Sequence, residues 1–190
     1  MSDEDRALVN EVYIPPNPAN PLIAAGAQLN SETIVARRVN KVTKGGRSEK
    51  FSLLVAVGDG NGLLGIGTAK GISYFDARSR AVRRACRDMF FVDRFEERTL
   101  FHELEAKTQA SKVIIMPAPE GHGVRANATA GALCRMAGIR DIMVKTHGTP
   151  NPWAIVEAFK KALEDHQSTE MVALKRGMRV HDVSKRYKEA

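Results

Sequence analysis

KVTKGGRSEKFSLLVAVGDGNGLLGIGTAKG, residues Lys41–Gly71, is the stretch of sequence that decides the fold. An apolar run from Phe51 to Val57 is followed by the glycine-rich segment Gly58–Gly62 and then by a second, shorter apolar stretch. Asp-Gly and Asn-Gly pairs between apolar runs are strong signals for a tight hairpin turn. The stretch therefore predicts two antiparallel strands joined by that turn.

A further strand is predicted upstream, so that residues 34–43 pair with residues 50–57 in a long first hairpin. The turn of this hairpin is Lys44-Gly45-Gly46-Arg47, in which the two glycines permit positive φ and a close approach of the backbone to a ligand. The hairpin contains no nucleophile, metal-ligand set or acid/base pair. Its cations predict a binding element for a polyanion, with the rest of the chain as its support.

The segment Gly60–Gly65 also matches the pattern G-x-G-x-x-G of dinucleotide-binding loops. Such a loop opens directly into a helix and has an acidic residue about 20 positions further on. Here the glycines continue through Gly67 and alternate with Leu64, Ile66 and Thr68. The pattern favours a hairpin turn and a strand, and no cofactor is expected.

A helix is predicted over residues 72–91, because small and apolar residues recur with helical spacing and can face a sheet. These residues are Ala77, Ala81, Val82, Ala85, Cys86 and Met89. Arginines occupy the other faces, and Arg80 and Arg84 are predicted phosphate contacts, because a guanidinium suits bidentate phosphate binding. A merely solvated charged face is the alternative interpretation.

Beyond residue 98 the order strand, strand, helix, strand, helix predicts a second α/β domain. The expected strands are 99–102, 112–116 and 141–146, and the expected helices are about 126–137 and 153–164. Gly138 is expected to end the first of these helices. A short helix is predicted over 170–175.

Four segments follow from these patterns: an extended arm at 1–30, a small α+β domain at 31–98, a second domain at 99–169 and a basic tail at 170–190. The arm contains four prolines between Pro15 and Pro21, which exclude a helix or a central strand. Residues 31–98 hold fourteen Lys and Arg against eight Asp and Glu, so the formal charge of +7 is concentrated beside the hairpin and in the tail. This distribution favours a phosphate backbone or an acidic surface as partner.

The sequence carries few signals for catalysis or metal binding. Cys86 and Cys134 have no C-x-x-C partner and suit helix cores, which predicts a reducing compartment. The five histidines form no metal-ligand spacing. One site resembles an anion-binding loop: Gly121-His122-Gly123 precedes a helix, so its backbone amides and Arg125 could hold a phosphate. Docking of this turn on RNA or on a partner protein is the alternative. No enzyme activity, metal or membrane span is expected.

Six blocks in register resemble one known family, that of the universal small-subunit ribosomal protein five, over residues about 34–176. They are VNKVTKGGR (39–47), FSLLVAVGDGNG (51–62), GIGTAK (65–70), GHGV (121–124), AGIRDIMVK (137–145) and Asn151-Pro152. The block FVDRFEERTLFH (91–102) and the segment GHGVR resemble mitochondrial members more than bacterial ones. The first residues of the chain are acidic, which is typical neither of a secretory signal nor of a transit peptide.

The resemblance implies an α+β fold with an N-terminal domain similar to double-stranded-RNA-binding modules. A left-handed β-α-β domain would follow, of the type also found in small-molecule kinases. In those kinases the glycine loop binds ATP and is followed by serines, whereas this chain has Arg125-Ala126-Asn127. An ATP site is therefore not expected.

The resemblance further implies a structural, non-enzymatic constituent of the small ribosomal subunit that binds rRNA near the decoding region and the place where mRNA enters. Expected partners are rRNA, the neighbouring proteins of families three, four and eight, and mRNA. The expected location is the mitochondrial matrix, with the bacterial cytoplasm as the alternative. Competing functions are a non-ribosomal RNA-binding regulator and a kinase-like ATP-binding protein.

The predicted RNA contacts gather in the first hairpin, with further contacts in the helix and in the glycine loop of the second domain. The hairpin residues are Arg37, Arg38, Lys41, Lys44, Gly45, Gly46, Arg47 and Lys50; the others are Arg80, Arg84, Gly121, Gly123 and Arg125. Aromatic stacking is not expected, and Phe51 is assigned to the core.

Overall fold

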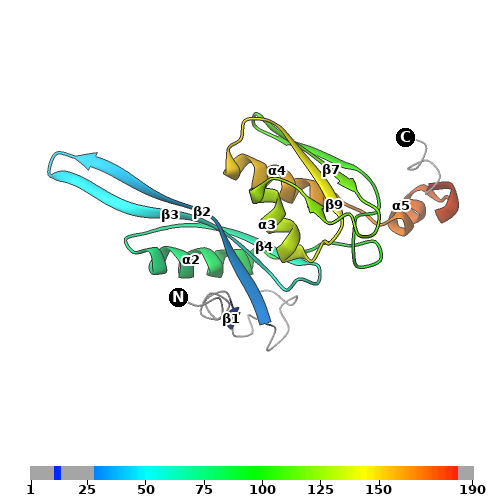
Figure 1. Ribbon diagram of the computed structural model, residues 1–190, viewed down its shortest axis with the longest axis horizontal. Coiled ribbons are helices and arrows are strands. Elements are labelled where there is room, and N and C mark those ends of the chain that lie inside the picture. The colour runs from blue at the N-terminus through cyan, green and yellow to red at the C-terminus, as the bar shows by residue number, and fades with distance from the viewer. Residues whose placement is uncertain (1–10, 14–27, 184–190) are drawn as a thin grey trace. The chain divides into compact units, whose positions relative to one another are not determined.

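The computed structural model describes residues 11–13 and 28–183 and divides the chain into two compact units. The first unit runs to Phe91 and includes Ala132–Gly138, and the second holds Val92–Gly131 and the chain from Ile139 on. Each unit combines one sheet with helices (Figure 1), so the predicted α+β class is confirmed. The proline segment 15–21 lies outside the described residues.

The first unit contains a five-stranded sheet in the order β1-β2-β3-β4-β5, with antiparallel pairing throughout. Its strands are β1 (Glu11–Tyr13), β2 (Gln28–Thr43), β3 (Gly46–Gly58), β4 (Leu63–Gly71) and β5 (Phe90–Phe91). The predicted hairpin is therefore present, and its pairing continues to Thr43↔Gly46 at the turn. Strand β1 was not predicted, because a strand of three residues carries no readable alternation. Residues 90–91 were predicted as the end of the helix over 72–91, which is wrong: the helix ends at Arg87 and these residues form β5.

Helix α2 (Tyr74–Arg87) packs on this sheet through the predicted stripe, which is confirmed. Ala77, Ala81 and Ala85 are fully buried against the Leu53, Val55 and Val57 side of β3. Helices approach a sheet this closely only where side chains are small, and β4 supplies glycines at the contact.

Gly65, Gly67 and Gly71 lie on the face of β4 that α2 covers. A Cβ atom at Gly67 would lie 2.0 Å from the carbonyl oxygen of Ala81, and one at Gly65 would lie 2.4 Å from that of Ala85. The repeated glycines are therefore required by helix–sheet packing, and the segment is a strand, as predicted. The preceding turn donates from the amides of Gly60 and Gly62 to the carbonyls of Met136 and Ala137 at 3.0 Å each.

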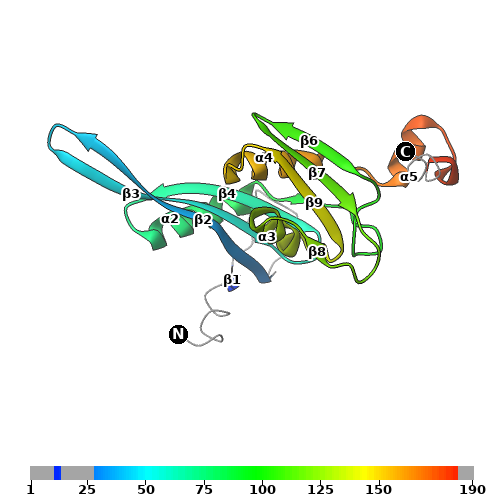
Figure 2. The same ribbon diagram turned by 45° about the horizontal axis from the view of Figure 1, so that its top comes forward.

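The second unit contains a four-stranded sheet in the order β6-β7-β9-β8 (Figure 2). Its elements are β6 (Leu104–Thr108), β7 (Ser111–Pro117), β8 (Val124–Arg125), α3 (Ala128–Ala137), which continues into the first unit, β9 (Ile142–Gly148), α4 (Pro152–Glu164) and α5 (Thr169–Arg176). Strands β8 and β9 are parallel neighbours joined by α3, which makes a β-α-β unit. Gly138 ends α3 with φ 72°, as predicted.

The predicted strand at 99–102 is wrong. Thr99 forms only an isolated bridge with Phe95, and the strand at this place is β6. The apolar signal of Leu100 and Phe101 comes from packing: Leu100 is buried, and the Phe101 ring lies 5.6 Å from that of Phe95. Strand β6 alternates only Leu104 and Ala106 with charged residues, so its sequence carries a weak strand signal and it was not predicted.

Candidate nucleic-acid interface

The register of the first hairpin sorts its predicted cations into two faces. Side chains of directly paired residues share a face of the sheet, and the face alternates along each strand. Arg37 pairs with Ser52, Val39 with Lys50 and Lys41 with Ser48, which places Arg37, Lys41 and Lys50 together. We call this the basic face; it is the face opposite α2, because Phe51, Leu53 and Val55 point toward the helix side.

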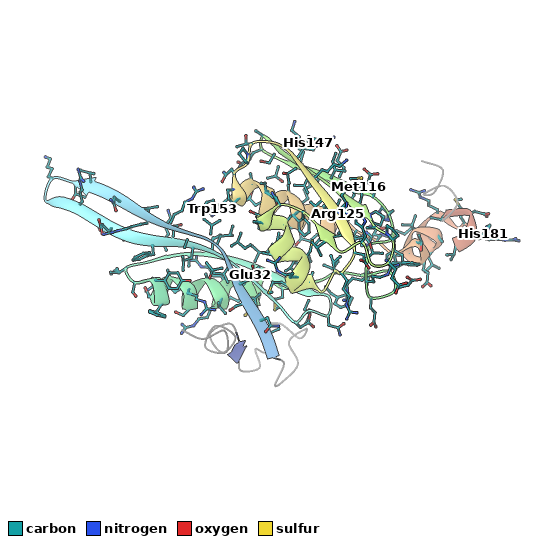
Figure 3. The ribbon with its side chains drawn as sticks, viewed as in Figure 1. Glu32, Met116, Arg125, His147, Trp153 and His181 are labelled. Carbon is teal, nitrogen blue, oxygen red and sulfur yellow. The ribbon has the colours of Figure 1, made fainter. Side chains whose placement is uncertain are left out.

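The basic face extends to a fourth cation, Lys70, because Ser52 pairs with Lys70 across β3 and β4. Sequence reasoning did not place Lys70 in the site, since only the strand register shows that it lies in a row with Arg37. Between residues 37–43, 46–52 and 68–70 this face carries no acidic side chain. The nearest acid along it is Glu32, labelled in Figure 3, which accepts a hydrogen bond from Arg135 at 2.8 Å.

The opposite face of the hairpin carries Arg38, Asn40 and Val42 on β2 and Arg47 and Glu49 on β3. Arg38 forms an ion pair with Glu49, and both side chains are largely exposed. Its positive charge is thus partly neutralised before any ligand arrives. The structure separates the predicted contacts on the two strands into three cations on the basic face and two, Arg38 and Arg47, on a face that also holds Glu49.

The predicted turn Lys44-Gly45-Gly46-Arg47 is shorter in the structure, where only Lys44 and Gly45 lie outside the paired strands, and it is open. Gly46 has φ 131°, which a side chain would strain, and a Cβ atom at either glycine would meet no atom within 4 Å. The exposed turn lies at the end of a hairpin that extends beyond the part of its sheet covered by α2 (Figures 1 and 2). Its backbone is accessible to a bulky ligand such as a phosphate chain.

The two arginines predicted in α2 already have partners within the protein. Arg80 forms an ion pair with Asp76 at 2.9 Å, one helical turn before it. Arg84 donates to the backbone carbonyl of Thr68 at 2.7 Å, which ties the helix to β4. Each keeps an exposed side chain, but part of its hydrogen-bonding capacity is used internally.

The glycine loop of the second unit is held by an acid. The amide of Gly123 donates to the Asp141 carboxylate at 2.8 Å, and Arg98 lies 3.4 Å from the same carboxylate. The Gly123 hydrogen bond, reinforced by Arg98, lowers the pKa of Asp141 below its ordinary value. The Gly123 amide predicted to hold a phosphate therefore already binds a carboxylate. Arg125 on β8 is exposed (Figure 3).

Cys86, Cys134 and His166 are buried, and burial shifts their pKa values. Burial raises the pKa of Cys86 to about 11 and that of Cys134 to about 12, so both thiols stay protonated. His102 and His166 stack with ring centroids 4.9 Å apart, and burial lowers the pKa of His166 to about 4. Among the described residues no group of three or more His, Cys, Asp or Glu is placed to bind a metal. No helix in the described ranges is long and apolar enough to cross a membrane.

The two compact units and the β2–β3 hairpin define the class of protein: a two-domain α+β protein with a projecting cationic hairpin. Two family models match the chain, "Ribosomal protein S5, N-terminal domain" over residues 29–93 and "Ribosomal protein S5, C-terminal domain" over residues 106–176. The chain belongs to the ribosomal protein S5 family, and the resemblance noted from the sequence blocks is confirmed.

Two relatives align with most of this chain and with nearly all of their own length. Small ribosomal subunit protein uS5 of Aliivibrio fischeri (strain MJ11) is 38% identical over 156 residues, which are 82% of this chain and 93% of the relative. The protein of the same name from Vibrio cholerae serotype O1 (strain ATCC 39315 / El Tor Inaba N16961) is 40% identical over the same shares of the two chains.

Proposed function

We propose that this chain is a structural constituent of the small ribosomal subunit that binds rRNA through the basic face and turn of its β2–β3 hairpin. Family membership supports the subunit, and one observation supports the surface: the strand register places Arg37, Lys41, Lys50 and Lys70 on one face of the described sheet. The family also supports a structural rather than an enzymatic role.

Charge on a flat, extended hairpin suits an RNA backbone. A-form RNA presents phosphates and 2′-hydroxyls over a wide, shallow surface and is recognised largely by shape. Lys and Arg contacts to phosphates release counterions, so the affinity should fall steeply with salt and depend weakly on sequence. The open turn at Gly45 and Gly46 adds a place where the backbone itself can approach RNA. Arg38 and Arg47 add contacts from the other face of the hairpin.

The experiment compares rRNA binding of two triple variants of the full chain in a salt titration. Arg37→Gln/Lys41→Gln/Lys50→Gln should weaken binding and lower the slope of log K against log salt by about 0.7–0.9 for each lost contact. The control Lys107→Gln/Lys161→Gln/Lys175→Gln removes the same charge from exposed positions outside the hairpin. Equal losses in the two variants would contradict the proposed surface.

The remaining predicted contacts and partners are also proposals. Gly121, Gly123 and Arg125 would contact RNA through Arg125 and the loop surface, since the Gly123 amide is engaged with Asp141. The proposed protein neighbours are the small-subunit proteins of families three, four and eight, with mRNA where it enters. Cross-linking of intact subunits followed by mass spectrometry tests these neighbours.

The proposed location is the ribosome of mitochondria, supported by the block at 91–102 and the segment GHGVR. The relatives reported above are bacterial, and a bacterial cytoplasm is the alternative. Sedimentation of organelle and cytosolic lysates, probed for this chain, distinguishes the two. A chain that sediments with small subunits in neither fraction would contradict the ribosomal function itself.

A further inference from the structure

Two large apolar side chains stand out of the first unit where β4 passes into α2. Ile72 is 81% exposed and Phe75 is 76% exposed, although the rest of the helix buries its apolar residues well. The exposure follows from helix geometry: at 100° per residue, Phe75 lies about 200° around the axis from Ala77, which faces the sheet. Phe75 therefore cannot join the core while the alanine stripe remains packed.

The Phe75 ring is held in place although it is exposed. Its neighbour Tyr74 is partly buried against the core, and the two rings meet edge to face with centroids 5.8 Å apart. The Tyr74 hydroxyl lies 3.5 Å from the Thr33 hydroxyl on β2. An aromatic ring supported in this way has lost part of its freedom before binding, which lowers the entropic cost of stacking on a ligand.

The outward face of α2 that begins at Phe75 is positively charged. Phe75, Ser79 and Arg83 follow one another at four-residue spacing, with Arg87 one turn further, and all four are exposed. In the described structure Arg83 and Arg87 have no hydrogen-bond or ion-pair partner, unlike Arg80 and Arg84. From Ala77 to Arg87 the helix has no acidic residue, and the one acid in its first turn, Asp76, is paired with Arg80.

We infer that this ridge, defined as Ile72, Phe75, Arg83 and Arg87, binds an unpaired segment of RNA, with Phe75 stacked on a base. The inference rests on the proposed function and adds a second, chemically different contact to the hairpin. An aromatic face beside free guanidinium groups is the combination that binds single-stranded nucleic acid, because bases stack on the ring while cations hold the backbone. Arg83 lies about 12 Å along the helix axis from Phe75, a separation of a few nucleotides.

A protein partner is the competing occupant, and the composition of the ridge disfavours it. Protein interfaces place their apolar residues at a centre depleted of unpaired charge. Here only two apolar residues stand at one end of a ridge whose other end carries two unpaired arginines. The charge pattern complements a phosphate backbone.

The first experiment places the photoreactive residue p-benzoylphenylalanine at position 75 of the full chain in source cells. Small subunits are purified, irradiated and mapped by primer extension and mass spectrometry. Cross-links from position 75 should reach an unpaired rRNA nucleotide. A cross-link to a protein, or none in subunits that contain the variant, overturns the inference. Absence of the unmodified chain from small subunits would instead contradict the proposed function, so the two failures are distinguishable.

The matched control carries the same residue at Leu174, which is 78% exposed on α5 in the other unit. It should give a different cross-link pattern, and an identical pattern overturns the inference.

A second measurement uses the isolated full chain and purified small-subunit rRNA, so it does not depend on assembly. Phe75→Leu keeps an apolar side chain but removes the ring, and should weaken binding about tenfold, whereas Phe75→Trp should retain it. Arg83→Gln/Arg87→Gln should lower the slope of log K against log salt by the amount expected for about two lost phosphate contacts. The difference in rRNA affinity between Phe75→Leu and Phe75→Trp should remain. Equal affinities of the leucine and tryptophan variants overturn the stacking.

Discussion

The Lys44–Arg47 turn and the Gly121–Gly123 loop both combine two glycines with nearby cations, yet only the second is bonded to a buried acid. In both motifs a Cβ atom at either glycine would meet no atom within 4 Å, and the first turn is exposed. In the second, Asp141 accepts the Gly123 amide and pairs with Arg98. Similar sequence motifs thus produce one open turn and one loop that is held by a carboxylate, and the difference comes from a residue 18 positions away.

The largest expected effect is that of Asp141→Ala, which would open the closed loop. The variant leaves the Gly123 amide without its acceptor and removes the buried one of the two carboxylates beside Arg98, whose side chain is 18% exposed. Removing one partner of a buried hydrogen-bonded ion pair destabilises a fold. We expect the urea midpoint of the second unit to fall by about 1 M, measured by near-UV circular dichroism. Glu96→Gln, which removes the exposed partner of Arg98, is the control and should shift the midpoint far less.

The next largest expected effect is a loss of stability in acid that affects the second unit, which contains His166. Burial first, and the neighbouring His102 second, lower the pKa of His166 to about 4 from an ordinary value of 6.5. As the pH falls, His166 therefore takes up a proton in the unfolded chain before it does so in the folded chain. The contribution of neutral His166 to the free energy of unfolding is complete above pH 6.5 and is lost as pH falls toward 4.

Urea midpoints measured from pH 7.5 to pH 4 should fall for the wild type in this window. His166→Phe should flatten the fall, because a phenyl ring can pack on Phe101 without titrating. The exposed His147→Gln is the control and should retain the wild-type profile. A profile for His166→Phe that still falls between pH 6.5 and 4 would assign the acid sensitivity to other groups.

Alanine at one glycine of each motif gives a smaller effect that again distinguishes them. Gly123 has φ 73°, so Gly123→Ala should cost about 1–2 kcal/mol of unfolding free energy through backbone strain alone, because no atom lies within 4 Å of the new Cβ. Gly45 has no positive φ and equal space, so Gly45→Ala should change stability by less than about 0.5 kcal/mol. Equal costs in urea unfolding would contradict the difference in backbone conformation.

The sequence predicted correctly those strands and helices whose signal comes from the spacing of neighbouring residues. The run Phe51–Val57 and the alanine spacing of α2 lie in the structure where they were expected, because strand alternation and helical periodicity are properties of neighbouring residues. The segment 99–102 was misread, because its apolar residues pack against partners that include His166, far along the chain. Tertiary packing of this kind leaves no period in the sequence.

The site was predictable in charge but not in arrangement. Its cations are visible in the sequence, whereas their division into faces depends on the pairing register, including the irregularity between Thr33 and Val35. A one-residue change of register would move each cation to the other face. The position of Lys70 on the basic face and the pair Arg38–Glu49 were not predicted for this reason, and the exposure of Phe75 was not predicted because it depends on the helix phase relative to the sheet.

The smallest expected effect tests whether the open hairpin already contains an internal competitor for its ligand. Glu49→Gln breaks the exposed ion pair with Arg38, and such pairs contribute less than about 1 kcal/mol, so stability should hardly change. The freed Arg38 can then contact a phosphate, and we expect tighter rRNA binding, with the salt slope steeper by up to about 0.7–0.9. Glu105→Gln is a matched control, since Glu105 is also an exposed strand acid paired with a cation, Lys112, on the adjacent strand. If both variants tighten binding equally, the gain reflects net charge alone; if only Glu49→Gln does, Arg38 belongs to the binding surface and Glu49 limits it.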